Sequence, residues 1–170
     1  MCERLTIRSC RRTYSVEFVV NYADAMRRNL QPKDYLIIDQ HVLELHPPLR
    51  PCVQPYAKLV VEPTEHAKSY SALIPFIQEL IDHRFTRQNR LVAIGGGIIQ
   101  DITAFTASIL FRGVDWLFFP TNLLSQCDSC IGSKTSINFG PYKNQVGGFY
   151  PPQAVYVDLA FLQTLPTREI

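Results

Sequence analysis

The sequence lacks a charge excess of either sign. Its 17 Lys and Arg residues against 15 Asp and Glu residues leave 170 residues with a net charge of +2. A balance this even argues against nucleic acid or an anionic membrane surface as a partner. With 46% hydrophobic and 19% charged residues, the chain can bury the core of one domain and is not a disordered tail.

Signals for export or membrane insertion are also missing. Ser and Arg crowd the first dozen residues, where the apolar core of a signal peptide would lie. The apolar stretch at residues 91–111 contains three glycines, Gln100 and Asp101, which a lipid-facing helix would leave unsatisfied. Five cysteines at irregular spacing do not resemble a disulfide framework. We therefore expect a reduced, cytoplasmic protein without a membrane partner.

Motifs for metal or nucleoside triphosphate binding are incomplete. Cys127 and Cys130 form a CxxC, but no second CxxC or histidine pair at ligand spacing accompanies it. We expect two small buried thiols, and no metal ligands in this chain. A P-loop needs glycine directly before its lysine, whereas Ser133 precedes Lys134. By spacing alone, Lys134 is equally compatible with a ligand contact and with a solvated surface lysine.

Short apolar runs alternate with helical patterns along the chain. The runs that read as buried strands are residues 35–38, 58–61, 91–94 and 116–119. Apolar spacing predicts a helix at 68–83, and a shorter helix is expected near 23–29. Residues 5–20 alternate as the two strands of a hairpin would. The pattern predicts an α/β fold with an N-terminal β-hairpin and a mostly parallel sheet covered by helices on both faces.

Residues 101–158 are poor in charge. They contain seven charged side chains, and glycines and prolines divide them into what reads as tight turns. Charges in a mostly apolar segment need partners or a ligand, because burying an unpaired charge is costly. This segment therefore looks like packed loops that form a binding site.

Several polar or glycine positions follow the expected strands, where ligands of parallel sheets bind. The run Gly95-Gly96-Gly97 would let a phosphate approach a helix N-terminus, or would only allow close packing of strand and helix. Asp39 would bind a ribose hydroxyl or cap the next helix. Asp101 would act at the ligand or complement the helix dipole. If Glu65 and Lys68 contact no ligand, Glu65 would cap the helix and Lys68 would be a solvated lysine, with the two paired at i,i+3.

Taken together, five linked segments resemble the dehydroquinate synthase family. They are GGGIIQD (95–101), RG (112–113), PTNLLSQCDSCIGSKTSIN (120–138), KNQVGGFYPP (143–152) and FLQTLPTRE (161–169). They occur in that family's order and spacing, densely over residues 91–170. Before residue 91 only Asp39 and the EHAK at 65–68 align. The wider clan of sugar phosphate cyclases shares most of these motifs.

The resemblance implies a Rossmann-like N-terminal domain that binds NAD, here residues 1–170. A C-terminal helical domain, absent from this chain, would carry the zinc. The family is a phosphate-eliminating carbon–oxygen lyase of the shikimate pathway and aromatic amino acid biosynthesis, and it cyclises a phosphorylated seven-carbon keto acid. We expect a small-molecule sugar phosphate as the substrate and a homodimer for the full-length enzyme. We also expect this domain alone to be inactive.

The resemblance also assigns residues. Those that would contact the adenosine part of NAD are Asp39, Glu65 and Lys68, and those near its pyrophosphate are Gly95, Gly96, Gly97 and Asp101. The rest of the cofactor pocket would come from Thr121, Asn122, Lys143, Phe161 and Thr164. Residues that would face the substrate are Asp128, Lys134 and Asn144, and Arg112 would reach the phosphate from a neighbouring subunit.

Departures from the family pattern leave alternatives open. Gln100 and Ser133 replace glycines, and we expect them to add bulk or polarity around the cofactor. Thr135 is as in dehydroquinate synthase, whereas Asn138-Phe139-Gly140 resembles cyclases that act on other sugar phosphates. The alternatives are therefore a domain of another sugar phosphate cyclase or a stand-alone nucleotide-binding module. A metal-dependent alcohol dehydrogenase related to the glycerol dehydrogenases ranks below both.

Overall fold

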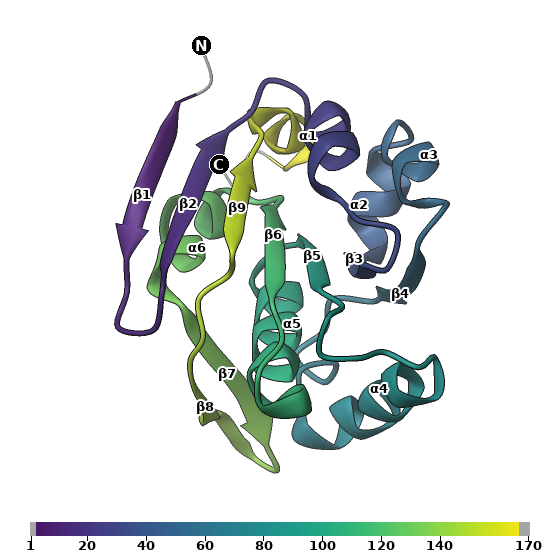
Figure 1. The fold of residues 1–170 in the computed structure, drawn as a ribbon, viewed down its shortest axis with the longest axis vertical. Coiled ribbons are helices and arrows are strands. Elements are labelled where there is room, and N and C mark those ends of the chain that lie inside the picture. The colour runs from purple at the N-terminus through teal and green to yellow at the C-terminus, as the bar shows by residue number, and fades with distance from the viewer. Residues whose placement is uncertain (1–2, 167–170) are drawn as a thin grey trace.

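The computed structural model of the chain describes residues 3–166 (Figure 1). The strands are β1 (Arg4–Arg8), β2 (Thr13–Phe18), β3 (Tyr35–Asp39), β4 (Ala57–Val61), β5 (Leu91–Gly95), β6 (Trp116–Pro120), β7 (Lys134–Phe139), β8 (Tyr142–Phe149) and β9 (Ala154–Val157). The α-helices are α1 (Tyr22–Asn29), α2 (Gln40–Leu45), α3 (Leu49–Val53), α4 (Tyr70–Asp82), α5 (Gly97–Ile109) and α6 (Cys130–Gly132). Three further helical turns are η1 (Leu110–Arg112), the π-helical η2 (Ser125–Ser129) and η3 (Leu159–Thr164).

Seven strands form one sheet in the order β1-β2-β9-β6-β5-β3-β4. β1 and β2 are the expected antiparallel hairpin, and every other pair in this sheet is parallel. The prediction of a Rossmann-like α/β fold with an N-terminal hairpin is confirmed.

Alternate residues of the central strands feed two separate cores. Leu36 and Ile38 of β3 pack with α1 and α3, whereas Tyr35 and Ile37 pack with α4 and α5. A strand buried on both faces must be apolar at successive positions, which is why these runs are continuous in the sequence. The sheet is thus covered by helices on both faces, as expected.

The apolar stretch at residues 91–111 divides as predicted. It forms β5, the glycine turn and α5, and the strand and most of the helix are buried. Across residues 3–166 there is no helix of the length and apolarity needed to cross a bilayer.

The segment at residues 134–149 differs from the expected loops. It forms a two-stranded antiparallel sheet of β7 and β8, with Gly140 at φ +56° in the connecting turn. β7 lies against α5, and Asn138 donates its backbone N–H to the carbonyl of Lys68 at 2.9 Å. Gly147 permits the close pairing, because a Cβ there would lie 1.5 Å from the carbonyl oxygen of Thr135. The prediction of packed loops is therefore wrong for this hairpin.

Parallel strands place their following segments side by side. In the sheet β5 lies between β3 and β6, with Ile38 opposite Ile94 and Gly95 opposite Pro120. The segments after these three strands therefore meet at the carboxyl edge of the sheet, where ligands of such folds bind.

Candidate functional site

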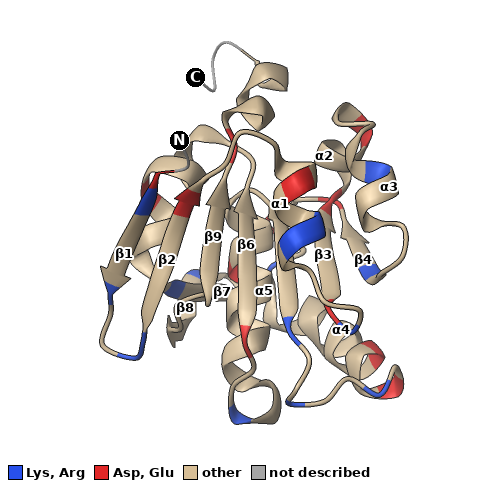
Figure 2. Ribbon diagram, turned by 45° about the horizontal axis from the view of Figure 1, so that its top comes forward, with Lys and Arg blue, Asp and Glu red and all other residues tan. Residues whose placement is uncertain are grey.

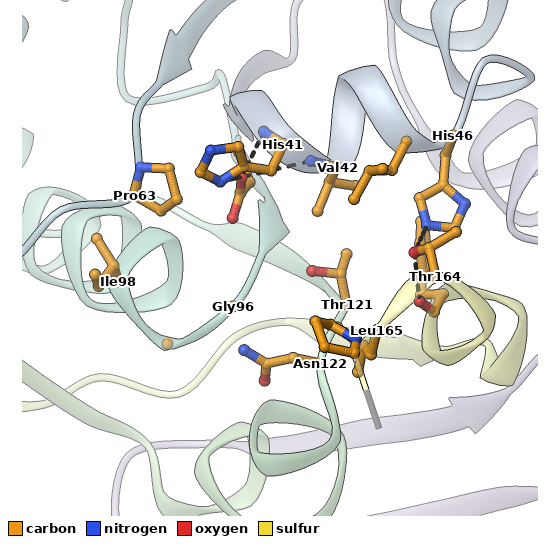
Figure 3. Close-up of a pocket in the computed structure, with 15 residues that line it drawn as sticks. His41, Val42, His46, Pro63, Gly96, Ile98, Thr121, Asn122, Thr164 and Leu165 are labelled. Atoms are coloured by element: carbon orange, nitrogen blue, oxygen red, sulfur yellow. Dashed lines mark hydrogen bonds and ion pairs between the residues drawn. The ribbon is translucent and has the colours of Figure 1, made fainter. Parts of the chain in front are cut away.

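A cavity of about 470 Å³ lies at this carboxyl edge (Figure 3). Its walls come from α2, the first turn of α5, the segment after β6 and η3. The lining residues include seven that the family resemblance assigns to the cofactor, namely Asp39, Gly96, Gly97, Thr121, Asn122, Phe161 and Thr164. The fold thus brings these seven residues together from four separate segments of the chain.

The three glycines after β5 differ in what surrounds them. A Cβ at Gly95 would lie 2.5 Å from Ile99 Cγ1, and a Cβ at Gly96 would lie 2.4 Å from Asn122 Nδ2. A Cβ at Gly97 would have no atom within 4 Å, and Gly97 lines the cavity. Gly95 therefore allows β5 and α5 to pack closely, which is the alternative role without a ligand. Gly97, in contrast, leaves room for a bound group.

α5 begins at this turn without a side-chain cap. Its N-cap is Gly96, whose carbonyl oxygen accepts the N–H of Gln100 at 3.0 Å. In the described part of the chain, no group accepts a hydrogen bond from the amides of residues 97–99. The free amides and the positive end of this 13-residue helix therefore lie at the wall of the cavity, an arrangement that favours an anion.

Asp39 ends β3 and is also the N-cap of α2. Its Oδ1 accepts the backbone N–H of His41 at 2.9 Å and of Val42 at 3.4 Å (Figure 3). Oδ2 accepts no hydrogen bond from residues 3–166. Burial raises the pKa of Asp39, and the two backbone N–H groups oppose that rise. One carboxylate oxygen thus caps the helix while the other is available to a hydroxyl in the cavity.

An aromatic group closes the end of the cavity beside η3. The Phe161 ring stacks on Tyr22 with centroids 4.5 Å apart, and the His46 ring meets Phe161 edge-on at 5.0 Å. His46 Nε2 lies 2.9 Å from Thr164 Oγ1 (Figure 3). Burial lowers the pKa of His46, so the ring is neutral near pH 7. This end of the cavity suits a flat, uncharged ring system.

Sequence reasoning missed half of this lining. The residues without a prior assignment are His41, Val42, Leu45, His46, Pro63, Ile98, Leu165 and Pro166. One signal could have found the first four. Asp39 was recognised as a possible helix cap, and a helix that starts there must run along the carboxyl edge of the sheet.

Lys68 organises a second polar group outside the cavity lining. Its Nζ lies 2.9 Å from Asp101 Oδ2, 2.8 Å from Asn144 Oδ1 and 3.9 Å from Glu65 Oε2. Only 7% of the Lys68 side chain is exposed, so the alternative of a solvated lysine is wrong. Burial raises the pKa of Asp101, and Lys68 opposes that rise. The i,i+3 contact with Glu65 is present, but Asp101 is the closer partner.

The remaining assigned residues are not brought into the cavity. Asp128, Lys134 and Lys143 are exposed, and among residues 3–166 their side chains have no hydrogen-bond or ion-pair partner. Lys134 pairs with Phe149 at the open end of the β7–β8 hairpin, whereas Lys143 follows its turn, so the two lysines lie apart. Arg112 ends η1, just before β6 begins, and thus lies at the opposite edge of the sheet.

Gln100 is directed away from the cavity. Its Nε2 donates to the Ser129 carbonyl at 2.7 Å, and Ser129 Oγ donates to Gln100 Oε1 at 2.6 Å. This reciprocal pair ties α5 to η2, and Gln100 does not line the cavity. Ser133 adopts φ +55° in the turn before β7 and does not line it either. Both residues were expected to add bulk or polarity around the cofactor, and neither lies in the lining of this cavity.

The two cysteines of the CxxC have different environments. Cys130 is buried and donates its thiol to the carbonyl of Gln126 at 3.3 Å, whereas Cys127 is exposed. The prediction of two buried thiols is therefore wrong for Cys127. The described residues include no cluster of three or more His, Cys, Asp or Glu side chains placed to hold a metal ion.

These features combine three kinds of recognition in one cavity. The uncapped start of α5 suits a phosphate group, the Oδ2 of Asp39 suits a sugar hydroxyl, and the rings of His46 and Phe161 suit a base. A nucleotide carries all three groups.

Comparison with known proteins identifies the family of this chain. Residues 58–170 match the family model described as 3-dehydroquinate synthase N-terminal. The chain is 47% identical over 111 residues to the 3-dehydroquinate synthase of Sulfurovum sp. (strain NBC37-1), which covers 65% of this chain and 32% of that protein. The chain thus spans about a third of the length of the curated relatives it matches.

Solved structures show the same fold. A 2-deoxy-scyllo-inosose synthase complexed with carbaglucose-6-phosphate, NAD+ and Co2+ superposes with a TM-score of 0.85 at 24% identity, over 98% of this chain and 49% of that one. The 2-epi-5-epi-valiolone synthase ValA of Streptomyces hygroscopicus subsp. jinggangensis 5008, with NAD+ and Zn2+ bound, gives 0.83 at 25% identity, over 95% and 47%. With two thirds of its length matched by the family model, this chain belongs to the 3-dehydroquinate synthase N-terminal domain family.

Proposed function

We propose that residues 1–170 are the NAD-binding domain of an enzyme like 3-dehydroquinate synthase. The full-length enzyme would be a phosphate-eliminating carbon–oxygen lyase of aromatic amino acid biosynthesis, cytoplasmic and homodimeric. Its substrate would be a phosphorylated seven-carbon keto acid. A helical domain with a zinc ion would occupy other parts of the enzyme, since this chain spans only about a third of its relatives.

The residues of the cavity fit NAD. The pyrophosphate would accept hydrogen bonds from the free amides at the start of α5, close to Gly97, where no side chain fills the space. The adenosine ribose would donate a hydroxyl to Asp39 Oδ2, and the adenine would lie against His46. Thr121 and Asn122 would bound the cavity on its β6 side.

NAD, when bound, supplies a hydride acceptor for an alcohol of the substrate. The chain itself would hold and orient the two reactants. Lys68 links Asp101, on α5, to Asn144, on β8, and so would fix the substrate-facing hairpin against the cofactor-binding helix. Asp128, Lys134 and Asn144 would face the substrate, whose phosphate and carboxylate suit a lysine. Arg112 would act in the site of the partner subunit, since it lies at the far edge of its own sheet.

The observation that carries the proposal is the uncapped start of α5 beside Asp39 in one cavity. Neither feature alone specifies a dinucleotide. Together they offer an anion site and a hydroxyl acceptor on neighbouring strands, which is how parallel α/β sheets bind dinucleotides.

A second candidate is a cyclase for another sugar phosphate. The segment Asn138-Phe139-Gly140 favours it, and the solved structures reported above are cyclases of that kind. The 47% identity to a 3-dehydroquinate synthase favours the first candidate. Turnover by the full-length enzyme decides between them, because only one of the two sugar phosphate substrates would be cyclised.

Titration calorimetry with NAD tests the cofactor assignment on this chain. We expect the chain to bind NAD, and Gly97→Ala to weaken binding about tenfold, because its methyl group would enter the cavity and displace a phosphate contact. Gly148→Ala is the matched control, since a Cβ there also has no atom within 4 Å but lies outside the cavity. Absence of NAD binding at millimolar cofactor, or equal effects of the two substitutions, would contradict the proposal.

The same preparation tests the proposed inactivity. With NAD, a divalent metal and the seven-carbon substrate, we expect no phosphate release by this chain alone. Cyclisation at a measurable rate would show that residues 1–170 carry the complete machinery.

A further inference from the structure

The CxxC at Cys127 and Cys130 takes no part in the nucleotide cavity. The sequence favoured two buried thiols there, but the structure buries only Cys130 and exposes Cys127. In the described part of the chain the other two cysteines, Cys10 and Cys52, lie singly, in the β1–β2 turn and on α3. An accessible thiol three residues from a shielded one is the arrangement in which oxidation of the first is resolved by the second.

The two cysteines lie on one continuous helical segment. Cys127 belongs to the π-helical η2, and α6 begins at Cys130, whose backbone N–H donates to the carbonyl of Ser125. Side chains three residues apart on a helix lie on the same face, with Cβ atoms about 5–6 Å apart. The Cys130 thiol donates to the carbonyl of Gln126 at 3.3 Å, so its sulfur leans back over the preceding turn. The buried sulfur is therefore directed toward the turn that carries the exposed one.

The two thiols differ in reactivity as well as in exposure. Burial raises the pKa of Cys130 to about 11, and the nearby Cys127 and Asp128 add to that rise. In the sequence, no lysine or arginine lies between Arg112 and Lys134, and Figure 2 shows β6, which leads to this segment, without a basic residue. Cys127 is thus the thiol that meets an oxidant from solution, and Cys130 stays protonated until Cys127 has reacted.

We propose that Cys127 and Cys130 form a reversible disulfide within one chain when the protein meets a hydroperoxide. The Cys127 thiolate attacks the terminal peroxide oxygen, so that an S–O bond forms and the O–O bond breaks. The hydroxide or alkoxide that leaves takes up the proton that Cys127 released. The Cys130 sulfur then attacks the Cys127 sulfenic acid, an S–S bond forms, and the hydroxyl group leaves as water with the Cys130 proton. Two thiols are thus oxidised to one disulfide, and hydrogen peroxide is reduced to two waters.

The disulfide requires a change in η2. Its two Cβ atoms must approach to about 3.5–4.5 Å, so the turn between Cys127 and Cys130 has to tighten. Ser129 lies in that turn and donates its Oγ to Gln100 Oε1 at 2.6 Å. A bond formed against such a constraint is more easily reduced than a relaxed structural disulfide. Asp128 lies in the same turn, so oxidation would also move the carboxylate assigned to the substrate. That consequence rests on the proposed function, whereas formation of the disulfide does not.

Treatment of this chain with hydrogen peroxide, followed by alkylation and mass spectrometry, tests the proposal. Trypsin cleaves after Arg112 and after Lys134, and so leaves both cysteines of the CxxC in one peptide. After peroxide we expect this peptide to carry no alkyl group and to weigh two hydrogens less than its reduced form. Dithiothreitol added before alkylation should restore both thiols.

Serine substitutions identify which thiol reacts first. In Cys130→Ser the sulfenic acid of Cys127 should persist and be trapped by dimedone, because no thiol resolves it. Cys130→Ala repeats the test if serine at this buried position prevents folding, which circular dichroism detects. In Cys127→Ser the shielded Cys130 should remain a thiol. Cys10→Ser is the matched control, since Cys10 is also exposed but lies outside the pair, and it should leave the disulfide unchanged.

Three results would overturn the proposal. They are alkylation of both cysteines after peroxide, conversion of Cys127 to the sulfinic acid in the wild type without a disulfide, and a disulfide that joins two chains instead of Cys127 and Cys130 of one chain. NAD is absent from every arm of the experiment. A chain that fails to bind NAD would therefore still form the disulfide, and the failure of either proposal can be recognised separately.

Discussion

Lys68 Nζ lies 2.9 Å from Asp101 Oδ2, with 7% and 18% of the two side chains exposed. The contact joins the segment before α4 to the second turn of α5, and Asn144 adds β8 to the same group at 2.8 Å. Three elements that border the proposed binding region are thus fixed by one ammonium group.

Replacing Lys68 by methionine should therefore destabilise the fold. Removing one partner of a buried pair leaves the other charge without compensation, and we expect a loss of about 3 kcal/mol in the free energy of unfolding at neutral pH. Chemical denaturation measures it. Lys33→Met, at an exposed position, is the control and should have little effect.

The effect of Lys68→Met should depend on pH. Burial already raises the pKa of Asp101, so ionisation of this carboxyl opposes folding. The protonated Asp101 carboxyl contributes stability that is fully present below its unfolded-state pKa and is lost as pH rises through its folded-state pKa. Without Lys68 the folded-state pKa rises further, so the variant should lose more stability between acidic and neutral pH than wild type. The assignment would be contradicted if the stability lost in Lys68→Met relative to wild type were independent of pH. It would also be contradicted if the same pH dependence persisted when Lys68→Met is combined with Asp101→Asn.

Asp39→Asn should alter the choice of nucleotide without unfolding the protein. Asparagine caps helices as well as aspartate, so α2 should persist. The loss of negative charge beside the ribose should weaken NAD binding about threefold to tenfold and should reduce the discrimination against NADP, whose ribose carries a phosphate. Parallel titrations of both nucleotides measure the ratio. Asp24→Asn, on the exposed first turn of α1, should leave that ratio unchanged.

The two cysteines of the CxxC should react at different rates. Burial raises the pKa of Cys130 to about 11, so little thiolate forms at pH 8, and the sulfur is also shielded. Cys127 is exposed and should be alkylated first. Mass spectrometry of peptides after brief iodoacetamide treatment, with and without denaturant, locates the label. Equal labelling of both residues in the native protein would show that Cys130 is accessible.

The sequence predicted the strands that are buried on both faces, because continuous apolar runs such as residues 91–94 have no other stable place in a chain of this size. Helix α4 was also found by its apolar spacing, but Ile74 and Ile81 of that pattern are 59% and 49% exposed. The apolar residues of this helix cover more of its surface than the sheet can bury, and only packing decides which of them face inward.

The β7–β8 hairpin and β9 could not be predicted in the same way. Glycines and prolines in residues 134–152 indicate turns locally, whereas Gly147 is required by a strand partner that is distant in sequence. The same limit applies to the site. Asp39 and Gly97 carry local signals, while the place of His46 depends on η3, more than a hundred residues later.

The most direct test of the central claim is a backbone amide NMR spectrum recorded while NAD is added. We predict the largest shift changes at the amides of Gly97, Ile98 and Ile99, which have no acceptor among residues 3–166 and would receive one from the pyrophosphate. Smaller changes should follow at His41 and Val42. An unchanged spectrum, or changes confined to residues away from the carboxyl edge of the sheet, would contradict the account.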